Sequence, residues 1–485
     1  MKATKKKLSF SKQNRLKKIE AGNIIILLRS YTLEQWLRAI RKLNIEYDKN
    51  NELIRAKPEF LVVGADLALK VARNNENNNL PTEQECYALF NAEINLSEGR
   101  QSLIKVFGIG GTSFLAAWQN RFHYTPANMV GRMLVLYEAY NEKLLEFLGV
   151  SIEDMYLILM LISGMYQNEH KYYFKKEDLI LEGSEYLSEE KISNFLNSFS
   201  ITQKEYQEVS KSEKIYEKSF GRFKFLIRYP IIETSDDKYT IPVYEQLLDT
   251  LSNNLYFTLL ENYAKIGSKD SKTFMDEFGL VLENYVLDLA RERFKRNQLV
   301  DANKIVRKNS ELRCEAVIIH KKQALAIEVK KMYFRRDDID NMDKVNIDKL
   351  LKNHIVKAFK QIENTLSYIR YKSNYGLIVI PDIMIGLEAI KSYIVEKYKD
   401  EAQFNSNTFL CTLSFYEALM ANDDDAIFEI LETTKSRDFS EGTDIIMVML
   451  SMKDANPSIQ FANSLLVNKR DELLKKAVPS KYIEQ

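Results

Sequence analysis

The spacing of apolar residues changes along the chain. From residue 82 to about 260, apolar positions recur mostly every three or four residues, which is typical of helices. The segment 30–45 predicts an amphipathic helix capped near Thr32, and the apolar run 155–166 predicts a buried core helix. Alternating and β-branched stretches over 221–242 interrupt this pattern around a polar turn. They predict a short hairpin.

The region after residue 275 predicts a mixture of helices and strands. Two β-branched, apolar runs joined by a short polar connection predict adjacent antiparallel strands. The predicted elements are, in order, a helix, a short extended piece, two strands, an amphipathic helix and a buried strand (278–296, 304–306, 313–320, 324–330, 350–370 and 376–382). The order is therefore helix, three strands, helix, strand.

These patterns predict an α+β protein of several domains. The chain has 485 residues, and a domain usually takes roughly 100–200. The asparagine-rich segment 74–79, followed by Leu80-Pro81, predicts a boundary loop. We expect a basic arm with a helical region, a mainly helical domain containing the hairpin, a mixed-sheet domain and a C-terminal helical region (1–80, 81–265, 270–390 and 391–485).

Composition excludes several classes of protein. Apolar residues make up 45% of the chain, which argues against disorder. Three cysteines in so long a chain exclude a disulfide framework and indicate a reducing, cytoplasmic setting. No stretch approaches the ~18 apolar residues of a membrane span, so we expect a soluble protein with no membrane partner.

Charge points to local rather than global binding of nucleic acid. Lysine and arginine number 69 against 68 acids, so the net charge of +1 creates no overall attraction. Eight basic residues precede Glu20, the first acid. This arm is either a solvated terminus or a segment that contacts phosphates.

Two carboxylates and a lysine lie on the predicted antiparallel strands. Glu315 is early in the first strand and Glu328 is near the end of the second, where a hairpin can bring them together. Lys330 follows by two residues, so the strand period places it on the same face as Glu328. Carboxylates of this kind suit Mg²⁺, and a neighbouring amine can orient water and offset charge on a reacting phosphate. The alternative is a surface ion-pair ladder, worth about 1 kcal/mol or less.

The pattern around these residues resembles the PD-(D/E)xK nuclease superfamily over about 275–382. The likeness rests on Glu328-Val-Lys330 ending an apolar strand, an acid beginning the strand before it, and Gln361 on the following helix. Upstream, a further set resembles the first-helix signature of the family (Gly279, Glu283, Tyr285 and Val286). The family's acid is usually aspartate, often after proline, whereas this chain has Cys314-Glu315 and a side chain one methylene longer.

The resemblance implies a mixed-sheet core of order αβββαβ that hydrolyses DNA phosphodiester bonds with Mg²⁺ or Mn²⁺. It implies metal ligation by Glu315 and Glu328 and water activation by Lys330. It also implies a supporting contact to metal or water from Glu283 and a site-lining role for Gln361. Without the resemblance, Glu283 reads as an exposed helical acid and Gln361 as an ordinary helical glutamine.

Basic residues gather around the same region. We expect five of them to contact the nucleic-acid backbone (Arg293, Arg296, Lys308, Lys331 and Arg335). Tyr333 and Phe334 lie among them and either stack on bases or pack in the core. No base-reading module accompanies them, so the sequence predicts no sequence discrimination.

The arrangement of a nuclease-type core with large helical regions is similar to prokaryotic anti-phage defence or restriction effectors. DNA is the expected partner. The alternatives are an RNA nuclease, or a catalytically inactive nuclease fold that binds nucleic acid or acts as a scaffold. A homodimer would suit double-strand cleavage, and the helical regions would suit a partner protein, but no residue pattern selects between these.

Overall fold

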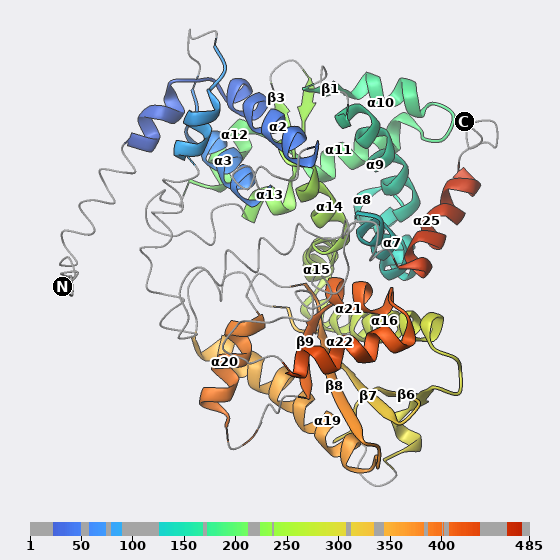
Figure 1. The fold of residues 1–485 in the computed structure, drawn as a ribbon. Coiled ribbons are helices and arrows are strands. Elements are labelled where there is room, and N and C mark those ends of the chain that lie inside the picture. The colour runs from blue at the N-terminus through green and yellow to red at the C-terminus, as the bar shows by residue number, and fades with distance from the viewer. Residues whose placement is uncertain are drawn as a thin grey trace, which may run out of the picture. The chain divides into compact units, whose positions relative to one another are not determined.

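The structure is a computed structural model of the chain, and part of the chain is described in detail. The described residues are 23–49, 58–73, 79–89, 126–167, 172–211, 224–234, 237–306, 312–333, 344–382, 387–399, 401, 407–436 and 463–477. This part is α+β, with many helices and two mixed sheets (Figure 1). None of its helices is both long enough and apolar enough to cross a membrane. The basic arm and residues 74–78 of the predicted boundary loop lie outside it.

Contacts divide the chain into two compact units. The first joins Met1–Gln101 to Ile158–Thr250, and the second joins Ser102–Leu157 to Leu251–Gln485. The four consecutive domains expected from the sequence remain a prediction.

Helices dominate the first unit. They are α2 (Leu33–Lys49), α3 (Pro58–Val71), α10 (Lys176–Gly183), α11 (Glu189–Phe199), α12 (Gln203–Val209) and α13 (Lys224–Arg228), with α9 (Ile152–Gln167) and α14 (Tyr244–Ser252) crossing the division between the units. The predicted cap of α2 is confirmed. The N–H of Gln35 donates to Thr32 Oγ1 at 3.3 Å, and the N–H of Thr32 donates to Gln35 Oε1 at 2.8 Å. The predicted core helix is also confirmed, since Tyr156 and Ile158 of α9 are fully buried.

A small mixed sheet lies in the same unit. Its order is β1-β4-β3-β2, formed by Phe174–Lys175, Lys238–Thr240, Ile231–Thr234 and Ser200–Thr202. Antiparallel β3 and β4 are the predicted hairpin, but they cover only its second half. The expectation of strand from residue 221 is wrong at α13, where Leu226 and Ile227 are buried on a short helix.

The second unit carries a five-stranded mixed sheet of order β5-β6-β7-β8-β9. Its strands are Leu299–Asp301, Ala316–His320, Gln323–Val329, Ser373–Ile380 and Thr408–Thr412. The strands β5, β6 and β7 form an antiparallel meander, and β7, β8 and β9 are parallel. The predicted antiparallel pair is confirmed as β6 and β7, joined at Lys321, which has a positive φ of 53°.

Helices precede, connect and follow these strands. They are α7 (Pro126–Tyr137), α8 (Asn141–Leu148), α15 (Leu255–Ile266), α16 (Ser268–Arg293), α18 (Lys344–Leu351), α19 (Lys357–Ser367), α20 (Leu387–Lys397), α21 (Leu413–Met420), α22 (Asp424–Ser436) and α25 (Ser464–Ala477). A π-helical segment, Lys352–Val356, joins α18 to α19, so the predicted amphipathic helix is one helix with a widened turn. From α16 to β8 the order is helix, three strands, helix, strand, as the sequence predicts.

Three details differ from the sequence expectations. The first strand is β5, whereas the expected piece at 304–306 follows a 3₁₀ turn that Asp301 caps through the N–H of Asn303 at 2.8 Å. Helix α16 begins ten residues before the predicted start, because its polar first turns show no apolar period. Strand β9 lies in the region expected to be helical.

Helix α19 packs directly on β7 and β8 (Figure 1). A Cβ atom at Gly376 of β8 would lie 2.4 Å from Ile362 Cγ2, so only glycine permits this approach. After Gln323, all residues of β7 are buried, as expected of a strand covered on both faces. A charged residue on this strand is therefore isolated from bulk water.

Candidate functional site

Glu328 and Lys330 meet at the end of β7. Glu328 is 0% exposed, and the ammonium of Lys330 donates a hydrogen bond to its Oε1. This contact places the two side chains on one face of the strand. The backbone N–H of Lys330 donates to the carbonyl of Val379 on β8 at 2.9 Å, which fixes the strand end against its parallel neighbour.

Glu315 lies directly before β6, beside the end of β7. Its N–H donates to the carbonyl of Ile327 at 3.0 Å, although Ile327 is the register partner of Ala316. Glu328 is the next residue of β7, and its charge acts on Glu315. The two carboxylates therefore lie close enough for their charges to interact.

Glu283 of α16 joins these two carboxylates. Its side chain is half-buried, and its carboxyl group shares a hydrogen bond with that of Glu315. It is therefore not an exposed helical acid. Helix and strand together bring three carboxyl groups to one place.

Gln361 of α19 also lies at the site. It is 8% exposed, and its Nε2 donates to the carbonyl of Arg313 at 2.8 Å. One turn later, Thr365 Oγ1 accepts the N–H of Cys314 at 3.0 Å. Helix α19 thus holds the backbone that leads into Glu315.

Burial and the charges of neighbouring carboxylates raise the pKa values of Glu315 and Glu328. Burial is the largest cause for Glu315, followed by the charges of Glu328 and Glu283. Burial also raises the pKa of Glu328, to about 7, although the charge and hydrogen bond of Lys330 oppose the shift. Near neutral pH these carboxyl groups need a proton or a cation to be stable together.

The residues present fit a hard divalent cation. Oε2 of Glu328 and Oε1 of Gln361 are buried acceptor atoms without a hydrogen-bond partner among the described residues. In the part of the chain that is described, no three histidine, cysteine, aspartate or glutamate side chains stand close enough to enclose a metal ion. Mg²⁺ usually takes only one or two carboxylates and keeps several waters. Glu315 and Glu328 supply that number.

The expected backbone-binding residues have different surroundings. Arg293 pairs with Asp423 at 3.0 Å and with Asp424 at 3.3 Å, while Arg296 is exposed. Lys331 is half-buried beside Gly279, and its Nζ lies 3.8 Å from Asp276. Lys308 and Arg335 lie outside the described residues. Contact of these five with nucleic acid stays a prediction.

Tyr333, which the sequence places among these basic residues, packs against aromatic residues of the core. Tyr333 stacks on Tyr256 with ring centroids 4.1 Å apart and planes 9° from parallel, and it meets Phe257 edge-on. Of the two alternatives, core packing holds for Tyr333. Phe334 is outside the described residues.

Two residues near the site were not expected from the sequence. The charge of Lys357 acts on Glu328, and His354 is close enough to Lys330, Lys331 and Lys357 for their charges to act on it. His354 precedes Gln361 by seven residues, which is two helical turns. This helical spacing from Gln361 is the sequence feature that could have pointed to His354.

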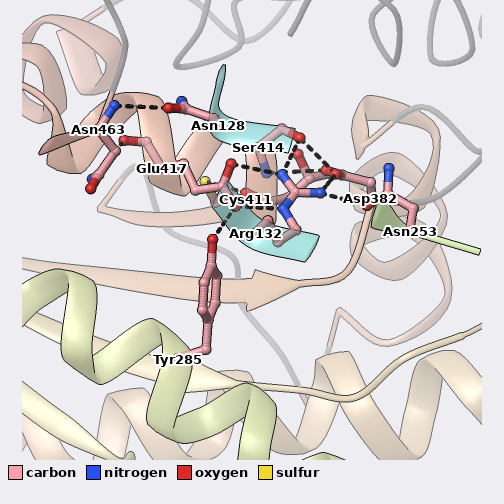
Figure 2. Close-up of polar contacts among 10 residues, drawn as sticks. Asn128, Arg132, Asn253, Tyr285, Asp382, Cys411, Ser414, Glu417 and Asn463 are labelled. Atoms are coloured by element: carbon pink, nitrogen blue, oxygen red, sulfur yellow. Dashed lines mark hydrogen bonds and ion pairs between the residues drawn. The ribbon is translucent and has the colours of Figure 1, made fainter. Parts of the chain in front are cut away.

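A second polar cluster, around Arg132, is closed to solvent (Figure 2). The Arg132 guanidinium binds Glu417 through Nε at 2.5 Å and Nη2 at 2.8 Å, and Nη1 binds Asp382 at 2.5 Å. Ser414 Oγ donates to Asp382 at 2.6 Å, and Tyr285 donates to Glu417 at 2.6 Å. Arg132 therefore joins α7 to the end of β8, to α21 and to α16.

The Arg132 cluster is a structural support for the site. The charge of Arg132 and the hydrogen bonds from the hydroxyl and the backbone N–H of Ser414 keep the pKa of Asp382 below its usual range. Burial raises the pKa of Glu417. Tyr285, which binds Glu417, is two residues from Glu283 on α16. No sequence pattern pointed to this cluster, because its members are far apart in the chain.

Comparison with protein-family models, with curated proteins and with solved structures gives no match to this chain. These comparisons therefore indicate no family for this chain.

Proposed function

We propose that this protein is a metal-dependent nuclease of the PD-(D/E)xK type that hydrolyses DNA phosphodiester bonds. The observation that carries the proposal is the buried Glu328, bound to Lys330 at the end of β7, with Glu315 close enough for the charges of the two carboxylates to interact. A fully buried acid at a strand end has a high desolvation cost. A role in cation binding explains why it is there.

The side chains have separate roles in this reaction. Glu315 and Glu328 would hold Mg²⁺ or Mn²⁺, which supplies Lewis-acid polarisation of the phosphate. Lys330 orients the attacking water and offsets the negative charge that develops on the phosphate as the P–O bond breaks. Glu283 holds Glu315 through their hydrogen bond, and the free Oε1 of Gln361 is an acceptor for water.

The biological setting that we propose is prokaryotic anti-phage defence or restriction. Its support is an analogy of architecture, a nuclease-type core within a chain rich in other helices. DNA-binding residues and a partner protein belong to the same proposal.

A catalytically silent core is the second candidate. The observation in its favour is that the Lys330 ammonium already occupies Oε1 of Glu328. In that case the ion pair is structural, and the core binds nucleic acid or a partner without cleaving.

Incubation with plasmid DNA and with RNA, each in Mg²⁺ and in EDTA, tests the proposal. We expect DNA cleavage in Mg²⁺ and none in EDTA. Lys330→Met should reduce the rate by ~10²-fold or more, as for loss of an electrostatic stabiliser. The control is Lys143→Met, which removes the lysine of an exposed pair with Glu146 on α8.

The outcomes separate the candidates. Cleavage of RNA alone would make the protein a ribonuclease. Binding of nucleic acid without cleavage would support the silent core. Cleavage that survives in Lys330→Met would contradict the assigned role of Lys330.

A further inference from the structure

Helix α19 and the π-helical segment before it carry two side chains that the proposed reaction does not use. His354 lies within the π-helical segment, and Lys357 is the first residue of α19. The N–H of Lys357 donates to the carbonyl of His354 where the π-helical segment ends. Single π-helical turns inside α-helices occur frequently at functional sites.

The surroundings of these two side chains are cationic. Lys330 and Lys331 follow β7, and both act on His354 together with Lys357. Lys357 also acts on the buried carboxylate of Glu328. The cluster thus lies beside the carboxylates and presents positive charge from two elements.

Neither side chain is engaged. His354 is half-buried and Lys357 is exposed, and neither side chain forms a hydrogen bond or ion pair with another described residue. By contrast, Lys352 and Lys360 on the same helical stretch both bind Glu401, at 3.1 and 2.9 Å. The lysine of this stretch whose charge acts on Glu328 is therefore one that no described carboxylate pairs with.

We propose that His354 and Lys357 bind a backbone phosphate of the DNA strand at the edge of the carboxylate site. The inference rests on the proposed function and adds two substrate-binding residues to it. Lys357 supplies a positive charge, and His354 supplies a ring N–H that donates to a phosphate oxygen.

His354 acts in this site as a neutral donor. Burial is the main cause that lowers its pKa, to about 4, and the charges of Lys330, Lys331 and Lys357 lower it further. The imidazole is therefore uncharged at neutral pH. A neutral donor can bind phosphate without adding a fourth positive charge to the cluster.

Binding of a fluorescent DNA duplex over a series of salt concentrations tests the inference. The assay is run in Ca²⁺ and in EDTA, and the variants are His354→Ala, His354→Gln and Lys357→Ala. We expect Lys357→Ala to weaken binding and to reduce the slope of log K against log[salt] by about 1, since one counterion-releasing contact is lost.

His354→Ala should weaken binding about 10-fold with an unchanged slope, because a neutral donor releases no counterion. His354→Gln, which keeps an N–H donor, should recover part of the loss. The matched controls are Lys360→Ala, one turn along α19, and His320→Ala at the opposite end of β6, both with wild-type binding. A melting curve of each variant checks the fold.

Wild-type binding by both His354→Ala and Lys357→Ala would overturn this inference and leave the proposed function standing. A reduced slope in His354→Ala would overturn the neutral-donor role. A wild-type protein that binds no duplex in either buffer would contradict the proposed function and this inference together.

Discussion

Glu283 in the middle of α16 shares a hydrogen bond with Glu315, which leads into β6. The charge of Glu328 on β7 in turn acts on Glu315. Three carboxyl groups, from α16, from the residue before β6 and from β7, therefore interact, and two of them have raised pKa values. Such a cluster is favourable only with a bound proton or cation.

Mg²⁺ should stabilise the folded protein. At pH 8 Glu328, with a pKa of about 7, is mostly ionised, and Glu315, with a pKa of about 8, is about half ionised. Binding of the cation therefore lowers the free energy of the folded state. The gain follows RT ln(1 + [L]/Kd), about 2.7 kcal/mol when the ligand is at 100 times Kd. Differential scanning fluorimetry with Mg²⁺ should show a rise in Tm for the wild type. The rise should be absent in Glu315→Gln and retained in Glu146→Gln, an exposed control.

Removal of the Glu328 charge should stabilise the metal-free protein at high pH. Folding raises the pKa of Glu328 from 4.5 to about 7, so the folded state binds more protons than the unfolded state between these values. The contribution of Glu328 to the free energy of unfolding of the wild type therefore falls as the pH rises from 4.5 to about 7, by ~3 kcal/mol in total. In EDTA, Glu328→Gln should unfold at a higher urea concentration than the wild type at pH 8. The difference should shrink toward pH 5, and a difference that does not vary with pH would contradict the shift.

Gly376→Ala should destabilise the five-stranded sheet. The new methyl group would meet Ile362 Cγ2 at 2.4 Å and force α19 away from β8, at a cost of ~1–3 kcal/mol. Urea denaturation measures this cost. The double variant Gly376→Ala/Ile362→Ala should lose less stability than the sum of the two single changes, because the smaller side chain makes room. If the stability loss of the double variant equals the sum of the two single losses, the contact between α19 and β8 is not the cause of the loss in Gly376→Ala.

Arg132→Met should cost ~3–5 kcal/mol of stability. The change leaves the buried carboxylates of Asp382 and Glu417 without their cation. Arg470→Met is the matched control, because Arg470 is partly exposed and, among the described residues, its ion pair is with its neighbour Asp471. Equal unfolding midpoints for the two variants would contradict a structural role for the Arg132 cluster (Figure 2).

The sequence predicts the parts of the fold that have a local pattern. The β6–β7 pair follows from β-branched runs and a short polar connection, and Glu328 and Lys330 share a face because of the strand period. Strand β9 has no such pattern. Its apolar run continues without a turn into α21, so strand and helix cannot be separated by periodicity.

Long-range polar contacts are the part that the sequence does not predict. Arg132, Asp382 and Glu417 are brought together only by the packing of α7 against α21 and the end of β8. Whether His354 and Lys357 have a polar partner also depends on packing, because helical spacing alone does not show which lysines form an ion pair with a carboxylate. The pairing of Glu315 with Glu328 as candidates could be made from the sequence because their spacing is local to one hairpin.

The most direct measurement is the single-turnover rate of DNA cleavage in Mn²⁺ by the wild type and by Glu328→Gln at pH 8. The substitution keeps the shape of the buried side chain and removes its negative charge. We expect a rate at least ~100-fold lower in Glu328→Gln, with a metal-free Tm equal to or above that of the wild type. Equal cleavage rates, or no cleavage by the wild-type protein, would contradict catalysis at this site.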